Sequence, residues 1–76
     1  MPEHVAIREQ SIRLGQLLKL AGAVDSGSEV KALLAERPVL VNGERETRRG
    51  RQLRHGDTVS IDGRELQVDA STQAPE

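Results

Sequence analysis

The sequence contains no cysteine and no phenylalanine, tyrosine or tryptophan. Without cysteine, neither a disulfide framework nor a cysteine-based zinc site can form, so this chain of 76 residues must fold on aliphatic packing alone. Without aromatic rings, the chain lacks the surface on which most single-strand readers stack nucleic-acid bases. If it binds RNA, it must therefore use arginine and lysine on phosphates, arginine planes as stacking surfaces, and backbone amides, which favours folded or duplex RNA recognised by its shape.

Long apolar runs and catalytic motifs are also missing. No stretch reaches the roughly 18 apolar residues of a membrane span, and the first ten residues are charged and lack the apolar segment of a secretory signal. We therefore expect a cytoplasmic protein that does not bind membranes. His4 and His55 are about fifty residues apart without ligand spacing, which predicts no metal site. No nucleophile or acid–base pair forms a recognisable motif, so we expect no enzyme, no cofactor and no small-molecule substrate.

What the chain does have is an uneven distribution of arginine. Five arginines and two acidic residues lie between Asn42 and Gly56, whereas the rest of the chain has six lysines and arginines against ten acidic residues. A positive segment in an otherwise acidic small protein favours binding of a polyanion. The alternative is a solvated loop whose charges pair with one another.

Two short helices are predicted before this segment. The leucines and alanine of residues 14–21 recur with helical spacing, and Gly22 follows as a C-terminal residue with positive φ. The next helix begins with a capping box, in which the Ser26 hydroxyl accepts from the amide of Glu29 and the Glu29 carboxylate accepts from the amide of Ser26. Pro38 ends that helix. The side chains expected to be buried are Leu14, Leu17, Leu18, Ala21, Val30, Leu33 and Leu34.

Short strands are predicted on either side of the helices. Asn42-Gly43 and Asp62-Gly63 are two-residue hairpin turns, and Leu53 should pin the arginine segment to the core. This order predicts one α+β domain over residues 1–69 and a flexible C-terminal tail over residues 70–76. The predicted strands lie at residues 5–7, 39–41, 59–61 and 66–68.

Several segments, in order, carry a resemblance to a known family. They resemble the RNA-binding domain of the ribosomal small-subunit protein S-four, also called the alpha-L RNA-binding motif, and within it the free-standing, ribosome-associated YbcJ-like branch. The resemblance implies two short helices packed on a small antiparallel sheet of about four to five strands, with RNA lying across the helix pair and the loop beside the hairpin. The segments are IRLGQLLKLAG (Ile12–Gly22), SGSEVKALLAE (Ser26–Glu36), VLVNGE (Val39–Glu44), TRRG (Thr47–Gly50), LRHGDTV (Leu53–Val59) and IDG (Ile61–Gly63).

The resemblance and the arginine segment together predict the RNA-binding residues. Arg13 and Lys19 match basic positions of the first helix, Lys31 follows the second-helix cap, and Asn42 lies in the hairpin turn. Arginine guanidinium groups suit bidentate hydrogen bonds to phosphate. The predicted set is Arg13, Lys19, Lys31, Asn42, Arg45, Arg48, Arg49, Arg51 and Arg54.

We therefore expect a monomeric protein that docks on structured, ribosomal RNA and acts in ribosome assembly, translation or the handling of stalled subunits. Two alternatives stay open. A protein-interaction or regulatory adaptor would use the acidic surplus against a basic partner, and its pull-down would survive nuclease treatment. A small DNA-binding module would not prefer an RNA hairpin over a matched DNA hairpin, because only a reader of A-form grooves or 2′-hydroxyls does so.

Overall fold

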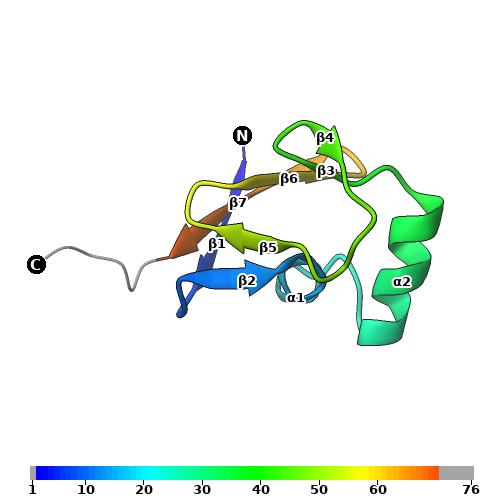
Figure 1. The fold of residues 1–76 in the computed structure, drawn as a ribbon, viewed down its shortest axis with the longest axis horizontal. Coiled ribbons are helices and arrows are strands. Elements are labelled where there is room, and N and C mark those ends of the chain that lie inside the picture. The colour runs from blue at the N-terminus through cyan, green and yellow to red at the C-terminus, as the bar shows by residue number, and fades with distance from the viewer. Residues whose placement is uncertain (1, 71–76) are drawn as a thin grey trace, which may run out of the picture.

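The computed structural model describes residues 2–70, which form two helices and seven strands (Figure 1). The predicted α+β class, with two short helices packed on a sheet, is confirmed. No helix among the described residues is long and apolar enough to cross a membrane. The elements are β1 (Glu3–Ile7), β2 (Ser11–Arg13), α1 (Leu14–Leu20), α2 (Gly27–Glu36), β3 (Leu40–Val41), β4 (Glu44–Arg45), β5 (Gln52–Arg54), β6 (Thr58–Ile61) and β7 (Arg64–Ala70).

The main sheet has five strands in the order β1-β7-β6-β3-β4. All its pairs are antiparallel except that of β1 with β7, which is parallel and places Val5 opposite Val68. The sheet is thus mixed, where the resemblance implied an antiparallel one. β7 returns beside β1 only after two helices and two hairpins, so no tight turn forces the antiparallel direction on this pair.

A second, two-stranded sheet was missed by the sequence prediction. β2 and β5 pair antiparallel, with Ile12 opposite Leu53. Leu53 is fully buried, which confirms that it pins the arginine segment to the core. This small sheet brings the segment after β4 back across the start of α1, and so it positions the charged side chains described below.

Both helices form where the leucine spacing predicts them and pack against each other, and Figure 1 shows α2 at one end of the molecule. Gly22 has φ 77°, as predicted for the residue that ends α1. Arg37 is extended ahead of Pro38, which confirms the end of α2. Of the residues expected to be buried, Ala21 and Leu33 are only partly so, and the fully buried ones are Leu14, Leu17, Leu18, Val30 and Leu34.

The predicted capping box at the start of α2 is wrong in both of its bonds. The Ser26 hydroxyl lies 3.1 Å from the hydroxyl of Ser28 and makes no side-chain cap. The carboxylate of Glu29 accepts from the amide of Asp25 at 2.7 Å, one residue earlier than predicted. The extended backbone of Ser26 turns its own carbonyl, instead of its hydroxyl, toward the amide of Glu29 at 3.2 Å.

The two predicted hairpin turns are confirmed by their backbone angles. Asn42 and Gly43 have φ of 52° and 87°, and Asp62 and Gly63 have φ of 52° and 80°. Two consecutive residues with positive φ give the turn whose twist matches paired strands. Asn and Asp tolerate this region better than other residues with a β-carbon, which explains their use at the first position.

The boundary between domain and tail needs one correction. Ala70, which the sequence prediction placed in the tail, is the last residue of β7, pairs with Ile7 and is 3% exposed. A small apolar residue opposite Ile7 closes the end of the core. The remainder of the predicted tail, residues 71–76, lies outside the described residues.

Candidate nucleic-acid interface

The loop of residues 46–51, which we call the arginine loop, joins β4 to β5 and lies against the start of α1. The amide of Leu14 donates to the carbonyl of Arg51 at 2.8 Å, and the amide of Gly15 donates to the carbonyl of Arg49 at 3.0 Å. Because the first amides of a helix have no partner within it, these two loop carbonyls cap α1. The loop and the helix therefore form one rigid unit.

Glu46 is the only buried charged residue among those the structure describes, with 7% of its surface exposed. Its carboxylate accepts from the amides of Thr47 and Arg48 at 3.1 and 3.0 Å. It also accepts from Arg48 Nε at 3.0 Å and from Arg51 Nη1 at 2.9 Å. The Arg48 side-chain and backbone bonds, helped by Arg51, lower the pKa of Glu46 from 4.5 to about 2.

Glu46 changes the interpretation of the arginine segment, because two of its arginines share the single negative charge of this carboxylate. Arg51 is bonded to it, and its side chain is 35% exposed. Arg48 is bonded to it too, but its side chain is 73% exposed and keeps donors toward solvent. Sequence reasoning counted Glu46 as one acidic residue among several and missed that it organises the loop.

Three of the predicted RNA-binding residues line one groove, which we call the basic groove. Arg13 comes from the end of β2, Lys19 from α1 and Arg49 from the arginine loop. The groove measures 330 Å³, and no acidic residue is among the described residues that line it. Its other lining residues are Gly15, Gln16, Gly27, Val30 and Gly50.

The basic groove is open to close approach along its backbone. A β-carbon built on Gly27 or Gly50 would meet nothing within 4 Å, so chain atoms there face free space. Gly27 is also the first residue of α2, and the partial positive charge of a helix N-terminus adds to the field of the basic side chains. Positive charge and exposed backbone at one place suit a phosphate group.

Lys31 lines the adjoining hollow instead of the basic groove itself. That hollow measures 380 Å³ and is lined by Lys31, Leu34, Ala35, Thr47 and Arg49. Arg49 is common to both depressions, so it stands between Lys31 on one side and the pair Arg13 and Lys19 on the other. Four of the nine predicted residues thus form a continuous basic surface over both helices.

The remaining predicted residues lie elsewhere. Arg45 is exposed on the edge strand β4, and Arg54 is exposed on β5, with its amide donating to Asp57 at 2.8 Å. Asn42 has a structural role, since its Oδ1 accepts from the amide of Thr58 at 2.9 Å and its Nδ2 donates to Asp57 at 3.2 Å. These bonds tie the hairpin turn to β6. None of these three predicted residues lines the basic groove.

Gly15 is the residue of the groove that sequence reasoning overlooked. A β-carbon at this position would lie 3.3 Å from Cγ1 of Val30 and 3.6 Å from the carbonyl oxygen of Arg49. Glycine therefore lets both α2 and the arginine loop approach α1. An isolated glycine inside a leucine-spaced helix is the signal that could have predicted such a close contact.

The two histidines are separate from this surface. His4 Nδ1 lies 2.9 Å from the carboxylate of Asp69, and His55 Nδ1 accepts from the amide of Ala70 at 3.0 Å. Residues 2–70 contain no group of three side chains able to hold a metal ion.

Comparison with known proteins identifies the family of this chain. Residues 5–69 match the S4 domain family. The chain is 48% identical over 63 residues to "Probable ribosome maturation protein RlbA" of Bacillus subtilis, which covers 83% of this chain and 89% of that protein. It is 42% identical over 57 residues to YbcJ of Escherichia coli, covering 75% of this chain and 81% of YbcJ.

A solved structure extends the likeness to three dimensions. The solution structure of Escherichia coli YbcJ, described as containing an alpha-L motif involved in RNA binding, superposes with a TM-score of 0.69 and 35% identity. The superposition covers 92% of this chain and 90% of YbcJ. Neither relative is named as an enzyme.

Proposed function

The chain belongs to the S4 domain family, and from this premise we propose that it binds structured RNA through the basic groove. The observation that carries the proposal is the convergence of Arg13, Lys19 and Arg49 on a groove lined by no acidic residue among those described. YbcJ supports it, since its alpha-L motif is described as involved in RNA binding.

The RNA is ribosomal in this proposal, and the protein acts as a monomer in the cytoplasm during ribosome maturation. The support is the similarity to the ribosome maturation protein RlbA, of which the chain matches 89%. The protein acts by docking in this proposal: it holds one conformation of the RNA in place. Neither a cofactor nor a small-molecule substrate takes part.

The arginines divide into two roles. Arg49 reaches the RNA, and its planar guanidinium donates two parallel hydrogen bonds to one phosphate. Arg51, with part of Arg48, stays on Glu46 and holds the arginine loop in shape. Arg13, Lys19 and Lys31 contact neighbouring phosphates, and the exposed Arg45 and Arg54 act only as distant charges.

Salt dependence tests this assignment. With about three to four phosphates neutralised, log K should fall with log[salt] at about 0.7 to 0.9 per phosphate. Arg49→Ala should lower the slope by about one such unit. Arg45→Ala removes the same charge outside the groove and should leave the slope nearly unchanged. If Arg45→Ala lowers the salt slope more than Arg49→Ala does, the interface lies at β4 instead of the basic groove. RNA binding that does not depend on salt would refute phosphate docking.

Crosslinking in cells, followed by sequencing of the attached RNA, identifies the partner. The wild type should enrich defined sites in ribosomal RNA, and Arg49→Ala should lose them while Arg45→Ala keeps them. The same diffuse background from all three proteins would contradict specific RNA binding. Competition between RNA and DNA hairpins of one sequence should favour RNA, because A-form geometry and 2′-hydroxyls distinguish the two.

One observation supports the adaptor alternative. A separate hollow is lined by Glu29, Glu36 and Asp62, and its single arginine, Arg37, is paired with Asp62 at 2.6 Å. A basic protein segment would fit this acidic surface. A complex that survives nuclease and Arg49→Ala, but is lost with Glu36→Lys, would identify the protein as an adaptor.

A further inference from the structure

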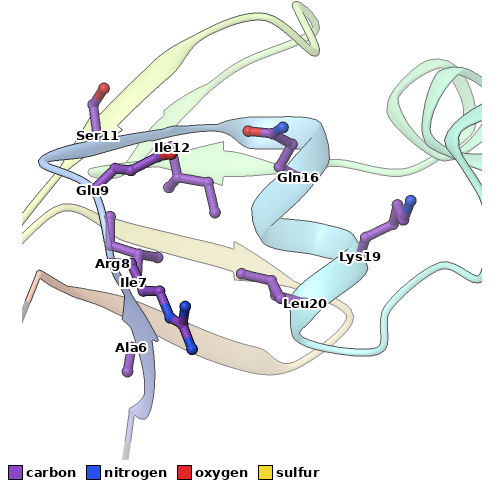
Figure 2. Close-up of a pocket in the computed structure, with 9 residues that line it drawn as sticks. All are labelled: Ala6, Ile7, Arg8, Glu9, Ser11, Ile12, Gln16, Lys19 and Leu20. Carbon is purple, nitrogen blue, oxygen red and sulfur yellow. The ribbon is translucent and has the colours of Figure 1, made fainter.

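A second groove adjoins the basic groove along α1, and Figure 2 shows the residues that line it. It measures 450 Å³ and runs between α1 and the chain that leads from β1 to β2. Its apolar lining consists of Ala6, Ile7, Ile12 and Leu20. Leu20 is 61% exposed and is the only large apolar side chain of the described residues that is exposed. We call this depression the Leu20 groove.

The two grooves are neighbours on the same helix. Gln16 and Lys19 line both of them, so α1 forms the ridge that separates them. Figure 2 shows Gln16 and Leu20 extending from α1 toward β1 and β2, whereas Lys19 extends toward the opposite side of the helix. A ligand that lies on the basic groove can therefore reach the Leu20 groove by crossing one helix.

The Leu20 groove is preformed because its two walls are tied together. Arg64 donates to the carboxylate of Glu3 on β1 at 2.7 Å and to the carbonyl of Ala21 at the end of α1 at 2.8 Å. The bond to Arg64 lowers the pKa of Glu3, and the two bonds together link the C-terminal end of α1 to β1. Ala21 directly follows Leu20, so these bonds position the backbone of the exposed leucine beside the groove.

We propose that the Leu20 groove receives one unpaired nucleobase of the RNA whose phosphates lie in the basic groove. This inference rests on the proposed function and adds to it a preference for a bulged or looped nucleotide. The face of a base is apolar and would pack on Leu20 and Ile12, while its edge would meet the hydroxyl of Ser11 and the carboxamide of Gln16. In a chain without aromatic rings, aliphatic faces and arginine planes are the surfaces available for a base.

The charges around the groove favour a nucleotide over an apolar peptide. Arg8 and Lys19 line it against a single acidic residue, Glu9. The RNA strand carries a phosphate on each side of an extruded base, and these phosphates need positively charged side chains along the rim of the Leu20 groove. Continuity with the basic groove supplies that charge, since Lys19 belongs to both grooves.

Two RNA hairpins with equal numbers of phosphates test the inference, one with a single bulged nucleotide and one fully paired. The wild type should bind the bulged hairpin about tenfold more tightly, which corresponds to about 1.4 kcal/mol. Leu20→Ser should abolish this preference and keep the salt slope. Arg49→Ala should weaken both hairpins equally and keep the preference.

The outcomes separate the two proposals. If the wild type binds neither hairpin, the proposed function fails. If it binds both equally with the expected salt slope, and Leu20→Ser binds likewise, only the base site is refuted. If Leu20→Ser loses a protein partner but prefers the bulged hairpin as the wild type does, the base site is also refuted. The groove would then be a protein-docking site.

A crosslink gives a readout that does not depend on the folding of a variant. A 4-thiouridine placed at the bulge should crosslink to the peptide that spans residues 6–20 of the wild type. A crosslink confined to residues of the arginine loop would overturn the proposal. Because Leu20 is exposed, Leu20→Ser should also unfold at the wild-type temperature.

Discussion

Gly15 of α1 donates its amide proton to the carbonyl oxygen of Arg49 at 3.0 Å, which joins the helix directly to the arginine loop. Through this bond the backbone of Arg49 is fixed on a helix, while its side chain lines both basic depressions. A residue on a mobile loop would lose conformational entropy on binding RNA, and a preorganised one loses less. RNA affinity and the packing around Gly15 are therefore coupled.

The first prediction concerns Gly15→Ala. The new methyl group would lie 3.3 Å from Cγ1 of Val30, so Val30 must give by a few tenths of an ångström, whereas its 3.6 Å distance to Arg49 is an ordinary contact. Alanine also raises helix propensity by about 1 kcal/mol, which offsets the crowding, so stability should change little. RNA affinity should fall nonetheless, because Gly15 and Val30 both line the basic groove and the added methyl group narrows it. Urea unfolding and RNA titration measure the two effects, and unchanged affinity would show that the packing around Gly15 does not shape the groove.

The second prediction concerns Glu46→Gln. The amides and guanidinium groups that converge on Glu46 would lose an ionised acceptor, so unfolding free energy should fall by about 1–3 kcal/mol. RNA affinity should fall too, although the chain gains positive charge, because Arg48 and Arg51 are no longer held.

The exposed Glu44 offers a matched control, since Glu44→Gln makes the same change of charge on β4. It should leave stability unchanged and raise RNA affinity slightly. If Glu46→Gln binds RNA more tightly than Glu44→Gln, then Glu46 acts only as a repelling charge and does not organise the loop.

The third prediction follows from the pKa of Glu46, which folding lowers from 4.5 to about 2. A carboxyl group whose pKa is depressed in the folded state contributes stability above its unfolded pKa. That contribution should be complete at neutral pH and decline as pH falls from about 5 toward about 2. The difference in unfolding free energy between the wild type and Glu46→Gln should therefore shrink over this range.

Urea unfolding at a series of pH values measures that difference. Glu3, whose pKa is also lowered by Arg64, acts in the same direction in both proteins and cancels in the comparison. A difference that stays constant down to pH about 3 would mean that Glu46 does not titrate in this way.

The features that the sequence predicts correctly are those that depend on residues adjacent in the chain. The glycine that ends α1, the extended residue before Pro38 and the Asn42-Gly43 turn each follow from the local backbone, and all are confirmed. The pairing of β2 with β5 joins residues about forty positions apart, and neither three-residue strand has a pattern of its own.

The candidate site also has one part that the local sequence predicts and another that depends on contacts made by the fold. The sequence predicts which residues are basic and that they gather near the hairpin. Which of them are available depends on Glu46, whose burial needs the arginine loop to fold back on α1. In the sequence, an acidic residue between arginines is expected to be exposed to solvent. The pattern therefore cannot distinguish Arg51, which is bonded to Glu46, from Arg49, which lines both basic depressions.

The last prediction decides the role of Asn42, which the sequence assigns to RNA and the structure ties to β6. Asn42→Ala removes its bonds to Thr58 and Asp57 and places a less tolerant residue at φ 52°. Stability should fall by about 1–3 kcal/mol, while the salt slope of RNA binding stays at the wild-type value. Asn42→Gly separates the two causes, because glycine accepts the backbone angle and lacks only the side-chain bonds. The Asn42→Gly variant should therefore lose less stability than the Asn42→Ala variant. A salt slope reduced by about one phosphate unit in both variants would instead place Asn42 in contact with RNA.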